Sequence, residues 1–589
     1  MKTYKLILTI AILFSIVSCE TKQKPSSLPE ANEKLSTIFD NYRSFQYYTF
    51  PQYATYEGFH DYDDRLADQS IAAYNRYIDS IKLIKSAVLT IDKAALSSSN
   101  QLNYDLFLVK LNEDINENEL RIGNYLSFSQ QNGFHIYFPQ ITGIQPLKTE
   151  KEVQNYIKRL EQFQKEANSI IADLKEGQEK GIVLPCSITE QVLLQLEGFV
   201  NTPTASNNLY TVINDSDAAN AQKEAIQTAI ETSVQPGYLA LYNYYKDFYH
   251  PNCREAVGLS AINGGQSYYE FLVKKHTSTD LTPDEIFSIG QSEVARIEAE
   301  IIKVQTEMGY GELSKQAFFD ELRNNPTFYY TDKEDLLQGF RSILKRMDTK
   351  LPELFSHLPK TPYDLKEIEE YRAAAAPAAY YYNAPEDGSR PGYFYVNTYN
   401  LKARPKYTMT ALALHEAVPG HHLQIALAKE MEDVPWFRNE MSVTAFVEGW
   451  GLYAEYLGYE TGMYDDVIQK MGALTFEMWR ACRLVVDVGM HYKGWTREEA
   501  IAYLKDNLPI TEPDIISEVD RYISWPGQAL AYKIGELKLK ALREKAETAL
   551  GDQFDVRSFH DAVLENGSLP LSILEANIDD WIAETKQEH

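Results

Sequence analysis

The chain has 589 residues, of which 44% are hydrophobic and 12% aromatic, and its formal net charge at pH 7 is −27. Such an acidic chain should repel nucleic acid and anionic lipid. We therefore expect no nucleic-acid partner and no membrane contact beyond a lipid anchor. The 41 tyrosines either pack helices together or line a binding cleft, and composition alone does not choose between the two.

The N-terminus has the pattern of an export signal. In MKTYKLILTIAILFSIVS, two lysines precede a mostly apolar run from Leu6 to Ile16, which is shorter than the roughly 20 apolar residues of a transmembrane helix. The run leads into IVSC, which resembles the lipobox of bacterial lipoproteins, so we predict a signal peptide over residues 1–18 and lipidation of Cys19. The lipid would hold the protein in the bacterial cell envelope, on the periplasmic side or at the cell surface. An ordinary secretory signal beside a chance cysteine is the alternative.

The remainder of the chain divides into a short tether and a large body. Residues 19–28 are polar and contain proline, which predicts a flexible tether. Residues 29–589 are long enough for several domains but contain no long Gly/Ser/Pro-rich linker and no obvious repeat, so we expect one two-lobed domain. Its cysteines, at positions 186, 253 and 482, are odd in number and widely spaced, so we expect small core residues and no disulfide framework.

Most windows of this body predict amphipathic helices. Apolar residues recur at three- and four-residue steps over residues 151–177, 282–307 and 333–348. The second of these helices starts with Thr282 as N-cap and Pro283 at the first helical position, followed by two acidic residues in the first turn. The sequence therefore predicts a mainly α fold.

One segment, AAYYYNAPEDGSRPGYFYVNTYN, departs from this pattern. Turn residues at 385–388 and 391–392 precede a β-favouring run from Tyr393 to Thr398, which predicts a strand or short hairpin. An extended peptide could pair with such a strand, in which case Tyr393, Tyr395 and Asn397 would bind substrate. The alternative is a structural hairpin that only covers the core.

The next segment, LALHEAVPGHHLQ, has three histidines and a glutamate within eight residues. In the zinc motif H-E-x-x-H the histidines lie on one helical face, but here Pro419 occupies the second histidine's position. In a straight helix neither His421 nor His422 could share an ion with His415. Proline and the glycine after it should kink or bulge the helix, and a bulge that loops out two residues would make His421 the second ligand.

A catalytic zinc requires a third protein ligand and an open position. Glu448, in FVEGWGLYAEYLGYE, has apolar neighbours in the sequence and fits the place of this ligand, because a buried carboxylate needs a partner. Glu455 is the alternative ligand or a carboxylate that supports a ligand from behind. The pattern therefore predicts a site for one Zn²⁺ ion held by His415, His421 and Glu448.

Further residues would supply the chemistry. Glu416, beside His415, would act as general base, and the developing oxyanion needs one more donor. Tyr532 is one candidate for this donor, and Arg521 and Gln528 in the same stretch would contact substrate. On an earlier helix, we expect Arg483 and Asp487 to form an ion pair, with Asp487 or His491 as possible support for the metal ligands.

Five segments in this order, RPGYFYVNT, HEAVPGHHLQ, FVEGWGLYAEYL, RACRLVVDVGMHYKGWT and YISWPGQALAYKIGELK, resemble the bacterial family known as domain of unknown function 885. That family is similar to helical gluzincin metallopeptidases of the thimet oligopeptidase and angiotensin-converting enzyme kind. The resemblance implies a helical zinc peptidase with a deep cleft that works on short peptides. It assigns His415, His421 and Glu448 to the metal and Tyr532 to the oxyanion, and it places His422 where the family often has another bulky residue.

Two other classes of function remain open from the sequence. A non-catalytic surface lipoprotein that binds peptide or glycan would suit a tyrosine-rich anchored body, but it would not need Glu416 beside a metal ligand. A non-haem iron centre with two histidines and a carboxylate is the third possibility, although such centres keep more open positions. The histidine–glutamate pair therefore favours hydrolysis. Whether the enzyme would be an exopeptidase or an endopeptidase, and its oligomeric state, are open.

Overall fold

The structure is a computed structural model that describes residues 27–215, 220–373, 376–385, 388 and 390–587. The predicted signal peptide, Cys19 and most of the predicted tether lie outside these residues. The first helix, α2, begins at Leu28, the last residue of the predicted tether. Among the described residues, no helix is both long and apolar enough to cross a membrane.

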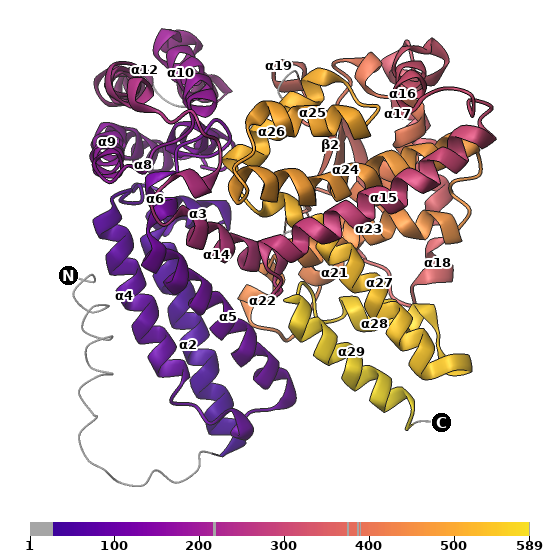
Figure 1. The fold of residues 1–589 in the computed structure, drawn as a ribbon. Coiled ribbons are helices and arrows are strands. Elements are labelled where there is room, and N and C mark those ends of the chain that lie inside the picture. The colour runs from indigo at the N-terminus through magenta and orange to yellow at the C-terminus, as the bar shows by residue number, and fades with distance from the viewer. Residues whose placement is uncertain (1–26, 216–219, 374–375, 386–387, 389, 588–589) are drawn as a thin grey trace.

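The protein is mainly α-helical and has two lobes (Figure 1). The N-terminal lobe, indigo to magenta in Figure 1, contains the helices α2 (Leu28–Thr49), α3 (Pro51–Tyr56), α4 (Ile71–Val88), α5 (Ser98–Leu120), α6 (Ile122–Tyr125), α7 (Phe134–Tyr137), α8 (Glu150–Glu161), α9 (Phe163–Glu179), α10 (Cys186–Asn201), α11 (Asn208–Thr211), α12 (Asn220–Ala229) and α13 (Gln235–Tyr244). Helix α14 (Gly265–Thr277) leads from this lobe to the other.

The C-terminal lobe is built around two long helices, α15 and α24, that lie side by side (Figure 1). Its helices are α15 (Pro283–Glu307), α16 (Lys315–Asn324), α17 (Lys333–Asp348), α18 (Leu351–Leu354), α19 (Glu370–Ala373), α20 (Met409–Glu416), α21 (His421–Lys429), α22 (Trp436–Glu440), α23 (Thr444–Glu460), α24 (Val467–His491), α25 (Arg497–Asn507), α26 (Glu512–Ser524), α27 (Ala531–Leu550), α28 (Val556–Leu564) and α29 (Leu571–Thr585). Helix α23 packs along α27 and against α20.

A small sheet of three strands covers α20. The strands β1 (Tyr363–Glu367), β2 (Ala379–Tyr382) and β3 (Gly392–Val396) have the order β1-β3-β2, with β1 parallel and β2 antiparallel to β3. Phe394 and Val396 pack against Met409 and Ala413 of α20. The predicted hairpin is confirmed, but its second strand is the central strand of the sheet, because β1 joins it from a segment that the sequence did not identify.

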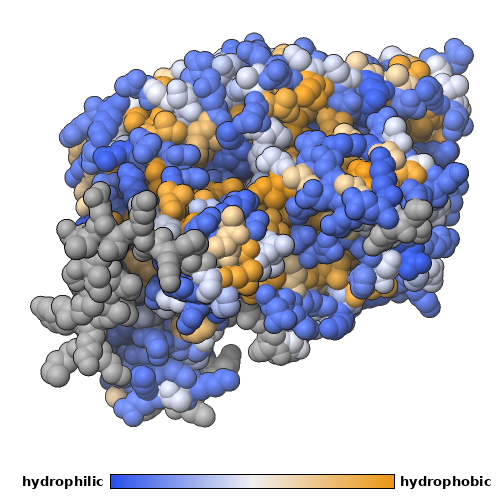
Figure 2. Space-filling model, turned by 90° about the horizontal axis from the view of Figure 1, so that it is seen from below, coloured by the Kyte–Doolittle hydropathy of each residue, from blue (hydrophilic) through white to orange (hydrophobic). Residues whose placement is uncertain are grey.

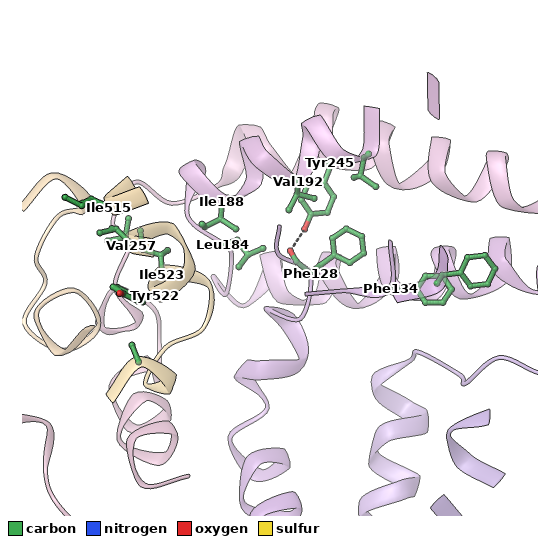
Figure 3. Close-up of a cluster of buried hydrophobic side chains, with 14 of the residues drawn as sticks. Phe128, Phe134, Leu184, Ile188, Val192, Tyr245, Val257, Ile515, Tyr522 and Ile523 are labelled. Atoms are coloured by element: carbon green, nitrogen blue, oxygen red, sulfur yellow. Dashed lines mark hydrogen bonds between the residues drawn. The ribbon is translucent and has the colours of Figure 1, made fainter. Parts of the chain in front are cut away.

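The lobes share one hydrophobic core, since side chains of α10 and α13 and of α24 and α26 belong to the same buried cluster. Figure 3 shows Ile515, Tyr522 and Ile523 of α26 on one side, near Val257 and Leu184 of the N-terminal lobe. Within the N-terminal lobe, the Tyr245 hydroxyl donates to the Phe128 carbonyl over 3.2 Å. Because tightly packed cores resist deformation, the shared cluster of buried side chains fixes α26 relative to the N-terminal lobe.

Two of the three predicted helices are confirmed. Helix α15 starts after Thr282, whose side chain and that of Glu285 form a reciprocal capping box, and α17 covers residues 333–348 as predicted. The third, over residues 151–177, is wrong as a single helix, because the chain is interrupted at Gln162 between α8 and α9. There the Ser233 hydroxyl donates to the Glu161 carbonyl and accepts from the Gln164 N–H, and such an insertion interrupts the helical ladder.

The expectation of no disulfide is also wrong. Cys186 and Cys253 are bonded to each other, 67 residues apart in sequence, whereas Cys482 is a free buried core residue as predicted. A short parallel bridge between Pro185 and Arg254, the residues next to them, brings the cysteines together. Spacing in the sequence could not show a contact made by two distant loops.

Candidate metal centre

Helix α20 ends with the pair His415–Glu416, and α21 begins at His421. The kink expected at Pro419–Gly420 is a complete interruption of the helix, across a cis Val418–Pro419 peptide. The chain turns so tightly here that a Cβ on Gly420 would lie 1.9 Å from the carbonyl oxygen of His415. Only glycine fits at this position, and the turn brings the His415 and His421 rings to a centroid distance of 4.6 Å.

Three ligand atoms meet at this turn. Glu448 Oε2 lies 3.6 Å from His415 Nε2 and 3.5 Å from His421 Nε2, and all three atoms lie within 4.8 Å of one another. Among the described residues, Glu448 Oε2 makes no hydrogen bond although it is buried. Two ligands about 2.0–2.1 Å from a tetrahedral zinc are about 3.3–3.4 Å apart. The separations therefore fit a shared metal ion.

One stretch of α23 forms the other half of the centre. Glu448 supplies the carboxylate, and the Trp450 indole N–H donates to the Pro419 carbonyl over 2.8 Å, which anchors the interrupted segment. At Gly451, a Cβ would lie 2.6 Å from the His415 ring, so only glycine lets α23 approach α20 this closely. The motif E-G-W-G thus provides a ligand, an anchor for the turn and room for the histidine.

Glu455 holds His415 from behind. Its Oε1 lies 2.8 Å from His415 Nδ1, on the side of the ring away from Nε2, and it pairs with Arg480 at 3.4 Å. A carboxylate in this position accepts a hydrogen bond from Nδ1–H, which fixes the tautomer that has the Nε2 lone pair toward the centre. Of the two roles considered for Glu455, the structure shows a support for His415 and not a member of the three-atom cluster.

The centre favours positive charge. Burial alone raises the pKa of Glu448, but His415 and His421 hold it far below the usual range of a glutamate. Burial lowers the pKa of His415, whereas the Glu448 and Glu455 carboxylates outweigh this and raise it to about 9. Without a metal, the second proton on His415 offsets part of the carboxylate charge. A cation that binds here displaces this proton, so its affinity rises with pH.

His422 faces away from the cluster. The Tyr381 hydroxyl lies 3.0 Å from its Nδ1, and the Tyr363 ring packs against it, so the side chain lies between α21 and the sheet. Burial lowers the pKa of His422 to about 4, as expected for a neutral core histidine. The structure brings His421, and not His422, to Glu448.

Glu416 and Tyr532 both border the centre. Glu416 is the last residue of α20 and is partly exposed, unlike His415 before it. The Tyr532 ring is stacked on the His415 ring at a centroid distance of 6.4 Å. Burial raises the pKa of Tyr532, and the Glu448 charge adds to the effect, so the phenol keeps its proton and can donate it in a hydrogen bond.

The expected ion pair between Arg483 and Asp487 does not form. Arg483 pairs with Glu518 at 3.0 Å, whereas Asp487 accepts hydrogen bonds from the Tyr269 hydroxyl and the Gly527 N–H. His491 lies 3.0 Å from the Tyr522 carbonyl and accepts from the Leu259 N–H. Glu518, Tyr269 and Gly527, which belong to other segments, thus replace the pairing of Arg483 with Asp487 one helical turn away. These contacts place Asp487 and His491 at the join between α24, α14 and α26, and neither bonds to a residue of the metal cluster.

The three residues predicted to bind substrate, Tyr393, Tyr395 and Asn397, do not share one environment. Side chains alternate along β3, so Tyr393 and Tyr395 occupy the face opposite Phe394 and Val396, which pack toward α20. The Asn397 amide donates to three carbonyls, those of Ala373, Ala376 and Pro377, and so closes the loop before β2. Substrate binding by these three residues stays a prediction.

Arg521 and Gln528 contact each other close to Tyr532. Arg521 donates to Gln528 Oε1 over 2.7 Å and forms an ion pair with Glu518 at 3.0 Å. Glu518 is a residue that the sequence interpretation missed, although its position three residues before Arg521 on a helix was a signal for a pair.

A cavity of about 1260 Å³ opens between the lobes. Its lining includes Tyr53 and Glu113 of the N-terminal lobe, Gln424 one turn after His421, and Val447 next to Glu448. Seen from below, the molecule is mostly hydrophilic, with hydrophobic side chains in a band across its middle (Figure 2). A cleft between the lobes therefore exists as expected, and two of its lining residues, Gln424 and Val447, are close in sequence to His421 and Glu448.

Comparison with known proteins identifies the family. The family described as bacterial protein of unknown function (DUF885) matches residues 51–578. The chain belongs to this family. The DUF885 match includes parts of both lobes, all three residues of the metal cluster and Tyr532. Among curated proteins, none matches the chain significantly.

Solved structures extend this result. A crystal structure described as a candidate lipoprotein from Colwellia psychrerythraea is 29% identical, covers 94% of this chain and 99% of its own, and superposes with a TM-score of 0.86. A second, described as a candidate lipoprotein of unknown function from Shewanella oneidensis, has 18% identity, the same coverage and a TM-score of 0.75, and shares the fold. A structure described as a candidate oligoendopeptidase F from Bacillus anthracis has 13% identity and a TM-score of 0.29, which is too low to show a common fold.

Proposed function

We propose that this DUF885 protein is a zinc-dependent peptidase that hydrolyses peptide bonds in short peptides. The observation that carries the proposal is the cluster of His415 Nε2, His421 Nε2 and Glu448 Oε2, with Glu416 next to His415 in the chain. Two imidazoles and one carboxylate suit Zn²⁺, and when bound the ion polarises a carbonyl and lowers the pKa of water.

The chain's own residues supply the rest of the reaction. Glu416 accepts a proton from the attacking water and passes it to the leaving amine, as a general base and then acid. The Tyr532 hydroxyl donates to the carbonyl oxygen as negative charge develops on it, which is the role of an oxyanion donor. Glu455 holds His415 in the orientation that keeps its Nε2 toward the centre.

An extended peptide has a place to bind beside the centre. Both edges of β3 are paired within the sheet, so the strand predicted for this role cannot take a further partner. Strand β2 forms an edge of the sheet and contacts α20. We infer that substrate backbone pairs with β2, and that the cleft between the lobes limits the enzyme to short, unfolded peptides.

The proposed location follows from a separate set of observations. The predicted lipobox at Cys19 and the relatives described as candidate lipoproteins support a lipid anchor in the bacterial cell envelope. The Cys186–Cys253 disulfide supports an oxidising compartment outside the cytoplasm.

The deciding experiment is the metal content of the purified mature protein, measured by elemental mass spectrometry without added zinc. We expect about one zinc per wild-type chain, loss of the metal in Glu448→Ala, and retention in a control, Glu460→Ala, on the same helix. Glu416→Gln should keep zinc and lose peptide hydrolysis by a factor of about 10²–10⁴, because it removes the base and not a ligand. A wild type that takes no metal even when zinc is offered would contradict the proposal and favour a peptide- or glycan-binding lipoprotein.

A further inference from the structure

A buried cluster of charges lies next to Tyr532, on segments that the proposed chemistry does not use. It consists of Arg483 on α24 with Glu518, Arg521 and Tyr522 on α26. Glu518 accepts from Arg483 and Arg521 at 3.0 Å each and from the Tyr522 hydroxyl at 2.7 Å. One carboxylate thus faces two guanidinium groups, and the cluster keeps one positive charge in excess.

Arg483 has hydrogen-bonding capacity that the protein does not use. Its side chain is only 6% exposed, its Nε donates to the Tyr522 hydroxyl and one terminal nitrogen donates to Glu518. The other terminal nitrogen is buried without a hydrogen-bond partner among the described residues. Because an unpaired buried cation is costly, a site of this kind is suited to an anion that completes the pairing.

The cluster lies close to the proposed reaction centre. The Arg483 guanidinium lies 4.4 Å from the centre of the Tyr532 ring, and the same ring is stacked on His415. Arg521 and Glu518 stay 16% and 20% exposed, so solvent reaches the edge of the cluster, where a bound anion would lie against Arg521 and beside the buried Arg483. One tyrosine ring thus separates the Arg483 guanidinium from His415, one of the proposed metal ligands, a distance that roughly two or three residues of an extended peptide span.

We propose that Arg483 and Arg521 form a subsite that binds a carboxylate of the peptide substrate; this rests on the proposed peptidase function. Guanidinium groups bind carboxylates through paired hydrogen bonds, and the free nitrogen of Arg483 beside Tyr532 offers such a contact. The carboxylate is that of the peptide C-terminus or that of an aspartate or glutamate side chain. Both sources have the same chemistry, and synthetic peptides separate them.

The test compares three peptides of otherwise equal, uncharged sequence: one with a free C-terminus, one amidated, and one amidated with a glutamine replaced by glutamate. Wild type should prefer a carboxylate-bearing peptide at least tenfold in kcat/KM, and which of the two it prefers identifies the source. Arg483→Gln and Arg521→Gln should raise KM for that peptide at least tenfold and raise KM for the fully amidated neutral peptide much less, so that the preference for the carboxylate is lost. Glu518 keeps one arginine in either variant, so both should fold.

The control is Arg497→Gln. It removes a guanidinium that pairs with Asp520, a residue of α26 like Glu518, and it should retain the wild-type preference for the carboxylate-bearing peptide. Equal rates of wild type on all three peptides would overturn the carboxylate subsite while the peptidase function stands. A fall of kcat on every peptide in Arg483→Gln would also overturn it, because Arg483 would then only position Tyr532.

Binding to the Glu416→Gln variant, measured by fluorescence polarisation of the same labelled peptides, separates the two proposals. Carboxylate-dependent binding that is lost when Arg483→Gln is added would support the subsite even if wild type hydrolyses none of the peptides, and only the peptidase function would fall. Binding that does not depend on the carboxylate would overturn the subsite.

Discussion

At the scale of single residues, the centre depends on where each side chain points and not on spacing alone. His421 and His422 are neighbours, yet one contributes to the cluster with Glu448 and the other packs between Tyr381 and Tyr363. The difference arises because α21 begins at His421, so adjacent side chains leave the helix about 100° apart.

This orientation leads to a prediction about metal binding. His421→Ala should lose zinc because it removes one of three ligands, whereas His422→Ala should keep a stoichiometric ion and lose stability, since it removes a buried ring from a packed contact. The measurement is zinc content together with the melting temperature of each variant. The opposite pattern, with metal lost only in His422→Ala, would mean that the chain turn is shifted by one residue.

The sequence predicts a residue of the centre when the signal for it lies in the residues around it in the chain. His415 and Glu448 stand in motifs whose residue types indicate a metal site, and Pro419 predicted the break that brings His421 to them. The partner of Arg483 could not be predicted, because Glu518 lies on another helix and is nearer than Asp487 on its own. Hydrogen bonds to residues of other helices thus outweigh the tendency of residues one turn apart on the same helix to pair.

At the scale of elements, the same limit appears where separate segments meet. The break between α8 and α9 is caused by Ser233, about 70 residues away, and the disulfide joins two loops that only the fold brings together. By contrast, α15 and α17 have local signals, a capping box and regular apolar spacing, and were predicted to within a residue. Signals within a segment thus predicted where helices form, whereas contacts with distant segments determine where a helix is interrupted.

Asp487 provides a test of one such junction. Burial raises the pKa of this carboxyl group to about 7, and hydrogen bonds from Tyr269 and Gly527 offset this only in part. An unfolded aspartate has a pKa near 3.9, so between about pH 4 and pH 7 the native protein holds a proton that the unfolded chain has lost. The free energy of unfolding should therefore fall as pH rises through this window, by at most about 1.4 kcal/mol per pH unit.

Asp487→Asn should remove this pH dependence while the junction stays in place. Both neighbours donate to the same oxygen, Oδ1, which asparagine retains. Melting temperatures recorded from pH 4 to pH 8 should fall less with rising pH in this variant than in wild type. The exposed Asp465→Asn serves as control and should follow the wild-type curve. Parallel curves for Asp487→Asn and wild type would show that the carboxyl group is already ionised in the folded protein at pH 4.

At the scale of the whole molecule, the centre joins helices that are otherwise held by packing and by two hydrogen-bonded contacts, Trp450 with Pro419 and His415 with Glu455. His415 is on α20, His421 on α21 and Glu448 on α23, and α23 in turn packs along α27, while the cleft beside them is walled by both lobes. An ion bound to all three ligands therefore ties these helices together. Because the unfolded chain has no such site, the binding free energy adds to the stability of the fold.

Removal of the ion should therefore lower the melting temperature of the whole protein. At a free zinc concentration about 100 times Kd, binding contributes about 2.7 kcal/mol, so a chelator should lower the melting temperature of wild type by a few degrees and zinc should restore it. Glu448→Ala should melt at the same temperature with chelator and with zinc, whereas Glu460→Ala should respond as wild type does. An equal response of Glu448→Ala and wild type would mean that zinc acts elsewhere on this acidic surface, since a chain of net charge −27 offers many weak carboxylate sites.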